Sequence, residues 1–161
     1  MFDVYGEFDS YKELNEAAAG QKEEGDRDAL IALAAENGID AEDAVAYFDG
    51  EEEELCTPLM AAFGKLQVEA AELKPTEIML DWLEYIKALC LADDKMKLAV
   101  RKKGKSLRGC IAHILAWSFK HQREIDRELL KAAGVSAGKV TMGIPGVGQT
   151  KRLIAEYYLE A

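Results

Sequence analysis

Residues 76–91 read TEIMLDWLEYIKALCL, and this stretch decides the fold of the chain. Its apolar residues recur at three- and four-residue intervals, which is the spacing of one face of an α-helix. They are Ile78, Met79, Trp82, Leu83, Ile86, Leu89 and Cys90. A face this broad needs neighbouring helices to cover it. The stretch therefore predicts the central helix of an all-α core.

Capping residues on both sides of this stretch predict more helices. Thr57 with Pro58, and Ser106, are typical helix starts, because a hydroxyl accepts from free first-turn amides and proline is tolerated at the first helical position. We expect helices over residues 10–24, 26–37, 40–48, 57–73, 106–121 and 126–133, a short helix through Leu98 and Val100, and a last helix through Tyr158. The predicted fold class is all-α, mostly helical, with about seven to eight short helices.

Two segments have an extended character instead. Residues 139–142, Lys-Val-Thr-Met, read as a strand, and residues 2–8 are a second candidate. If residues 2–8 form a strand, residues 139–142 are its expected partner. This one small two-stranded pairing would bring the two ends of the chain together.

Charge divides the chain into two halves. Residues 1–94 hold 25 Asp and Glu against 6 Lys and Arg, whereas residues 95–161 hold 5 against 14. Opposite charges at the two ends suit a protein that binds two kinds of surface, and the alternative is that the halves neutralise each other inside one fold. We expect an acidic helical hairpin region at 1–56 and a helical core with a basic C-terminal half at 57–161, together one compact unit.

Composition indicates a cytoplasmic protein that makes no use of a membrane. The longest uncharged apolar stretch, residues 110–119, is far shorter than a bilayer span. The N-terminus is acidic, unlike the basic start of a secretory signal. The cysteines Cys56, Cys90 and Cys110 lie in apolar surroundings and are expected as buried thiols.

The acidic half offers a candidate surface for binding a protein partner. Its residues are Asp40, Glu42, Asp43, Asp49, Glu51, Glu52, Glu53 and Glu54. The run of glutamates imitates the closely spaced charges of a nucleic acid, so it suits a basic protein surface. An exposed acidic loop without a partner is the alternative.

The basic half offers a candidate nucleic-acid-binding surface. From Lys95 to Arg108, seven of fourteen residues are positive, enough to follow a phosphate backbone. The candidate contacts are Arg101, Lys102, Lys103, Lys105, Arg108, Trp117 and Lys120. Trp117 would act as a stacking platform, and the lysine and arginine side chains are expected to lie off the apolar helix faces. A solvated basic loop and a tryptophan at the edge of the core are the alternatives.

Residues 144–148, Ile-Pro-Gly-Val-Gly, form the sharpest local motif. A hydrophobic-Pro-Gly-hydrophobic-Gly sequence that opens a helix is typical of helix-hairpin-helix modules, whose free amides hold a DNA phosphate. Gly146, Gly148, Lys151 and Arg152 would supply this contact. The segment before the turn is short for a first helix, and a purely structural turn is the alternative.

Motifs for enzyme activity and metal binding are missing from the sequence. There is no nucleophile elbow, Walker loop or Rossmann fingerprint. Cys110 and His113 are spaced to share a metal ion, but His121 lies roughly 12 Å further along the same predicted helix and faces away. We therefore expect no enzyme activity, no cofactor and no metal site.

Five segments carry a resemblance to a known family: Lys74–Met79, Val100–Leu107, Lys131–Val135, Gly143–Gly146 and the ending Tyr157-Tyr158-Leu159. They resemble the PcfK-like proteins of bacterial conjugative elements. The resemblance covers nearly the whole chain and is most specific from Lys74 onward. Members of this family are identified as anti-CRISPR proteins that inhibit the RNA-guided nuclease of type II systems.

The resemblance implies a function and a partner for the charged halves. It implies an inhibitor that binds a type II CRISPR effector nuclease, or its guide-RNA complex, in the cytoplasm of a bacterial host cell. Such an effector has a positively charged channel and reads the target-adjacent motif with arginines, so the acidic region 1–56 suits either surface. Residues 95–152 would contact DNA or RNA. The alternative is a nucleic-acid-binding accessory protein of plasmid transfer, whose acidic half recruits a partner.

Overall fold

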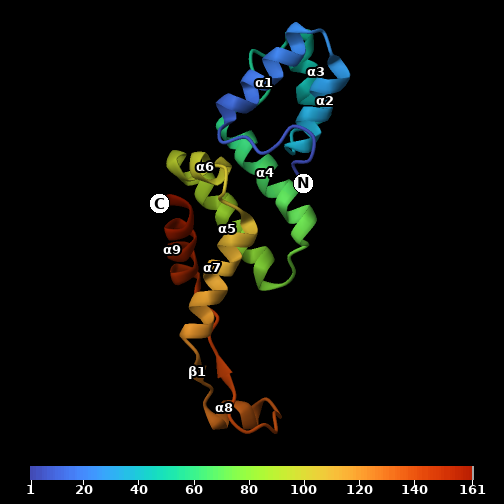
Figure 1. Cartoon of the computed structure of the whole chain (residues 1–161). Coiled ribbons are helices and arrows are strands. Elements are labelled where there is room, and N and C mark those ends of the chain that lie inside the picture. Colours follow the sequence, from blue (N-terminus) through green and yellow to red (C-terminus); the bar gives the residue numbers. More distant parts are fainter. Residues whose placement is uncertain (161) are drawn as a thin grey trace.

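The computed structural model describes residues 1–160, which form nine helices and one two-stranded sheet. The helices are α1 (Tyr11–Glu23), α2 (Arg27–Glu36), α3 (Ala41–Asp49), α4 (Pro58–Leu73), α5 (Ile78–Ala92), α6 (Asp94–Arg101), α7 (Leu107–Lys120), α8 (Arg127–Ala132) and α9 (Val147–Leu159), and the strands are β1 (Arg123–Glu124) and β2 (Thr141–Met142). The molecule is elongated, with α1–α3 at one end and α8 with the strands at the other (Figure 1). The predicted all-α class with one small strand pair is confirmed.

Side-chain caps set most helix starts where the sequence predicts them. The Oγ atoms of Ser10 and Ser106 accept from the amides three residues later at 3.2 and 3.0 Å. Thr57 does the same at 3.2 Å, with Pro58 at the first helical position. Asp40 precedes α3 but its side chain makes no capping bond. These bonds satisfy amides that have no partner inside the helix.

Two hydrophobic clusters hold the fold together. One lies in the N-terminal lobe, which we define as residues 1–56, and is formed by α1–α3 with the start of α4. The other lies in the helical bundle of α4–α7 and α9, where Trp82 and Ile86 are 1% and 0% exposed. Helix α4 joins the two clusters, since its residue Ala61 belongs to the first cluster and its residue Leu66 to the second. Residues 76–91 thus hold the central position predicted for them.

The lobe and the bundle approach each other most closely at two glycines. Gly38 follows α2 and has a φ of +69°, in the left-handed region that favours glycine. Gly64 lies in the middle of α4, and a Cβ on either glycine would overlap the backbone of the other. The pair therefore lets the turn between α2 and α3 lie directly against α4.

The strand pair has one expected partner and one unexpected one. Residues 141–142 form a strand as predicted, but β2 pairs antiparallel with β1, Arg123 opposite Met142 and Glu124 opposite Thr141. The prediction that residues 2–8 pair with this strand was wrong, because that segment forms no strand. β1 is much nearer in sequence, so closing the connecting loop costs less entropy.

Residues 1–9 are instead held by hydrogen bonds to other elements. The amides of Val4 and Tyr5 donate to the Glu36 carboxylate at 3.1 and 3.0 Å. Asp9 Oδ1 accepts from the Lys103 amide at 2.9 Å. The segment therefore crosses from the lobe to the bundle without pairing with a strand.

The arm, which we define as residues 121–146, projects from the end of α7 (Figure 1). Pro145 is the one buried residue in it. Phe119, a large apolar residue just before the arm, is 76% exposed. Helix α7 buries Leu107, Ile111, Ile114 and Ser118, a stripe that Phe119 does not share. Within residues 1–160, no helix is both long and apolar enough to cross a membrane.

Candidate interaction surfaces

The predicted acidic residues gather on α3 and the loop that follows it. Asp40, Glu42, Asp49 and Glu51–Glu54 are exposed, and Asp43 is half-buried. Gly50, with a φ of +82°, ends α3 and turns the chain into the loop. The side chains of Leu55 and Cys56 then anchor the loop in the lobe cluster. The loop therefore presents its carboxylates outward from a fixed base.

Five of these carboxylates surround one hollow in the surface. The hollow has a volume of about 500 Å³ and is lined by Asp43, Glu51, Glu52, Glu53, Glu54, Leu55, Cys56, Thr57 and Met60. A concave surface lined by one sign of charge focuses the electrostatic potential. This hollow is therefore suited to receive a positively charged group. We call Asp40, Glu42, Asp43, Asp49 and Glu51–Glu54 the acidic surface.

No residue of the acidic surface forms an ion pair within residues 1–160. The ion pairs of this part of the chain join Met1 to Asp3, Lys65 to Glu7, Lys87 to Glu84, Lys97 to Asp94, Arg108 to Glu72 and His113 to Glu156. Lys22, a basic residue of the lobe, donates to the Tyr47 carbonyl at 2.7 Å. The acidic surface thus keeps its charge unneutralised by the rest of the fold.

The predicted basic run is divided by the fold. Arg101 is 1% exposed, so the expectation that its side chain lies off the apolar face was wrong. It follows Val100 at the end of α6, where the lobe covers it, and its Nη2 donates to Asn37 Oδ1 of the lobe at 2.8 Å. Arg101 therefore does not belong to an exposed nucleic-acid surface.

Two further members of the run have partners inside the protein. Lys105 Nζ donates to the carbonyls of Tyr157 and Glu160 at 2.7 and 2.9 Å. A lysine there satisfies carbonyls at the C-terminus of α9 and complements the helix dipole. Arg108 is exposed and lies 3.7 Å from the Glu72 carboxylate. Lys102 and Lys103 are exposed, with no ion pair in the described part of the chain.

Trp117 and Lys120 lie near the end of α7. The Trp117 ring is half-buried and stacks on His121 with ring centroids 4.1 Å apart. His121 also approaches the Trp117 carbonyl, with Nδ1 2.7 Å away. One face of the tryptophan is thus already covered, which limits it as a stacking platform. Lys120 is exposed.

The turn at residues 144–148 follows a strand, so the first helix of a helix-hairpin-helix module is absent from this part of the structure. Gly146 is the N-cap of α9 with a φ of −67°, and a Cβ on Gly146 or Gly148 would meet nothing within 4 Å. Neither glycine has a positive φ, and neither is required by close packing. Lys151 and Arg152 are exposed, with the Lys151 ammonium 5.7 Å from the centre of the Tyr85 ring.

A buried polar cluster at the junction of lobe and bundle was missed by the sequence analysis. Lys65 Nζ is fully buried and donates to Glu7 Oε1 at 2.7 Å and to the carbonyls of Lys102 and Lys105 at 2.7 and 2.6 Å. Glu69, one turn further along α4, accepts from the Leu107 amide at 2.9 Å. Burial raises the Glu69 pKa to about 7. The available signal was the four-residue spacing of Lys65 and Glu69 beside the apolar stripe of α4.

The cysteines are free and buried, as predicted. Burial raises the pKa of Cys56, Cys90 and Cys110 to about 12, so the thiols are poor nucleophiles at neutral pH. Among residues 1–160, no group of three or more His, Cys, Asp or Glu side chains is arranged to hold a metal ion. No protein-family model, curated protein or solved structure matches this chain.

Proposed function

We propose that this protein is an anti-CRISPR inhibitor of a type II RNA-guided DNA endonuclease, and that it binds the effector through the acidic surface. One observation carries the proposal: the carboxylates of Asp40–Glu54 are solvent-facing and form no ion pair within residues 1–160. The resemblance to PcfK-like proteins, on residues that span most of the sequence, supplies the partner. A type II effector offers a basic channel and arginines that read the target-adjacent motif.

The test measures binding to the purified effector and guide RNA without target DNA. We expect a complex whose association rate falls steeply as salt rises, because exposed charges steer the encounter and are screened at high ionic strength. Changing Glu51, Glu52, Glu53 and Glu54 to Lys should slow association at least tenfold and abolish inhibition of cleavage. The melting temperature should stay nearly unchanged, since these side chains are exposed.

A matched variant controls for net charge alone. Glu23, Glu24, Asp28 and Asp81 are also exposed and have no ion pair in the described part of the chain. Changing these four residues to Lys alters the net charge by the same amount but leaves the hollow of the acidic surface intact. Equal effects of the two variants, or unchanged inhibition by the Glu51–Glu54 variant, would contradict the assignment of the binding surface.

A second candidate is a nucleic-acid-binding accessory protein of plasmid transfer. The observation that favours it is the set of exposed cations Lys102, Lys103, Lys120, Lys151 and Arg152 in the basic half. This protein would bind duplex DNA with no effector present. Changing Lys102 and Lys103 to Ala should then flatten the slope of log affinity against log salt by about one unit per lost phosphate contact. Absence of DNA binding by the unaltered protein at low salt would rule this candidate out.

A further inference from the structure

Arg101 is a buried cation whose hydrogen bonds are incomplete. Its Nη2 atom donates to Asn37, but Nε and Nη1 have no acceptor, and the side chain forms no ion pair within residues 1–160. The ring centre of Phe2 lies 5.6 Å from Cζ. A buried charge without a partner is unfavourable. An unsatisfied buried group in a native protein often marks the place of an ion or ligand.

Lys65 at the same junction shows that the fold can satisfy a buried cation fully. Its ammonium group has three hydrogen atoms to donate, and it has three acceptors at 2.6 to 2.7 Å. Arg101 is buried to the same degree but has one acceptor. The shortage of acceptors is therefore specific to Arg101, and an anion beside its side chain would supply them.

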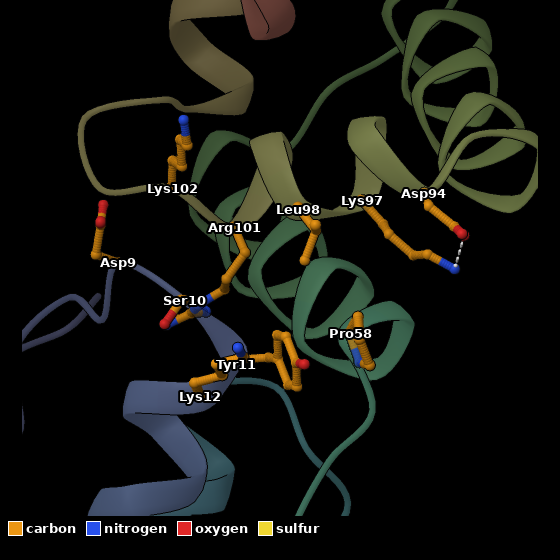
Figure 2. Close-up of a pocket in the computed structure, with 10 residues that line it drawn as sticks. All are labelled: Asp9, Ser10, Tyr11, Lys12, Pro58, Asp94, Lys97, Leu98, Arg101 and Lys102. Carbon is orange, nitrogen blue, oxygen red and sulfur yellow. Dashed lines mark ion pairs between the residues drawn. The ribbon is translucent and has the colours of Figure 1, made fainter.

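Arg101 lines a hollow between the N-terminal lobe and α6, shown in Figure 2. The hollow has a volume of about 480 Å³ and is lined by Asp9, Ser10, Tyr11, Lys12, Pro58, Asp94, Lys97, Leu98, Arg101 and Lys102. In the picture, the Arg101 side chain runs from α6 toward Ser10 at the start of α1. This 13-residue helix begins beside the hollow, and the positive end of its dipole favours an anion there.

The charge of this hollow is opposite to that of the lobe beside it. Residues 1–56 hold 18 Asp and Glu against 3 Lys and Arg, yet the hollow has four cationic side chains and two carboxylates. Both carboxylates are engaged, Asp9 with the Lys103 amide at 2.9 Å and Asp94 with Lys97 at 2.7 Å. Because the neutral Lys103 amide does not cancel the charge of Asp9, the lining keeps an excess of two positive charges for a ligand.

The rest of the wall is apolar and contains an aromatic ring. Tyr11, Pro58 and Leu98 supply it, and Figure 2 shows the Tyr11 ring on the side of Pro58 and Leu98. A volume of about 480 Å³ is within the range of small-molecule sites and far larger than a single inorganic anion needs. Aromatic and apolar walls suit a planar base, which stacks on such rings.

We propose that this hollow binds a phosphate monoester carried on a nucleoside, either a free mononucleotide or the 5′-terminal nucleotide of a strand. The phosphate lies toward Arg101, Lys102 and the start of α1, and the base lies against Tyr11, Pro58 and Leu98. Arginine fits phosphate oxygens with its planar set of donors. The Nε and Nη1 atoms are covered, so binding includes a small shift of neighbouring side chains, which is common at binding sites. The site lies outside the acidic surface and is tested without the effector.

Calorimetry on the full chain at low salt tests this site with four ligands: AMP, adenosine, inorganic phosphate and a short DNA strand with a 5′-phosphate. We expect saturable binding of AMP or of the phosphorylated strand, and the tighter of the two identifies the natural source of the nucleotide. Adenosine and inorganic phosphate should bind at least tenfold more weakly. Equal binding of phosphate and AMP, or binding of neither AMP nor the strand, would overturn the proposal.

Variants locate the binding in the hollow without relying on Arg101 alone. Changing Lys12 and Lys102 to Ala removes two exposed charges at the hollow and should weaken AMP binding at least tenfold, with an unchanged melting temperature. Changing Lys131 and Lys139 in the arm to Ala makes the same charge change elsewhere and should have no effect. Arg101→Lys keeps the charge but loses the planar set of donors, so it should also weaken AMP binding. Equal affinities of all three variants for AMP would contradict the assignment of the binding site to this hollow.

Discussion

Lys65 of α4 and Glu7 of the N-terminal segment, 58 residues apart in sequence, form a 2.7 Å ion pair at the junction of lobe and bundle. The same ammonium group bonds the carbonyls of Lys102 and Lys105 in the loop between α6 and α7. One side chain therefore ties together three segments that are distant in sequence. This bonding explains how a lysine is tolerated with no exposure to solvent.

Replacing Lys65 with Met should destabilise the protein. The substitution conserves much of the side-chain volume but leaves two carbonyls without a donor, and Glu7 without its partner. Removing one partner of a buried ion pair costs about 3 kcal/mol or more, which chemical denaturation would measure. Glu7→Gln is the milder control, because its amide oxygen still accepts from Lys65. Equal stability of K65M and the unaltered protein would contradict this role.

Glu69 should make stability depend on pH near neutrality. Burial is the largest cause that raises its pKa from 4.5 to about 7. Between these values the folded protein binds more protons than the unfolded chain, so the free energy of unfolding falls as pH rises through this range. A pKa shift of this size changes the free energy of unfolding by on the order of 3 kcal/mol.

The variant Glu69→Gln isolates this titration. Its amide oxygen still accepts from the Leu107 amide, and the neutral side chain has no charge to bury. We expect E69Q to be more stable than the unaltered protein at pH 8 and about equal at pH 4.5. Denaturation curves at several pH values measure the difference between the two proteins. Parallel pH profiles would show that Glu69 does not titrate as described.

Gly38 and Gly146 should respond differently to an added side chain. Gly38→Ala introduces a Cβ at positive φ against the Gly64 backbone, and we expect a loss of about 2 kcal/mol or more. Gly146→Ser meets open space and adds a capping hydroxyl at the start of α9, so it should raise stability by a few tenths of a kcal/mol. Thermal unfolding of both variants checks the contrast, and a similar loss in both would contradict it.

Lys151 and Arg152 should prove unimportant for folding. Both are exposed in the first turns of α9, and exposed charges contribute only a few tenths of a kcal/mol. Changing both to Gln should leave the melting temperature unchanged. If the turn is purely structural, the change should also alter any DNA affinity by less than about twofold. A loss of tenfold or more at constant melting temperature would instead indicate a phosphate at the turn.

Local sequence patterns were sufficient to predict the helices and most of their ends. Helix periodicity and helix caps act over a few residues, so they can be recognised in the sequence without knowledge of the fold. The caps at Ser10, Thr57 and Ser106 are examples. The central place of residues 76–91 followed in the same way, because an apolar face this broad has to be covered. The acidic surface was also predictable as a set, since consecutive glutamates at a loop have no apolar side to bury.

Exposure within the basic run depends on the tertiary structure. Arg101 and Lys103 look alike in a basic run, but the lobe covers Arg101 and leaves Lys103 in solvent. The partner of β2 was decided in the same way, because pairing depends on which segment the fold brings alongside. Burial of Lys65, Glu69 and Arg101 depends on contacts between segments dozens of residues apart, and local pattern does not encode such contacts.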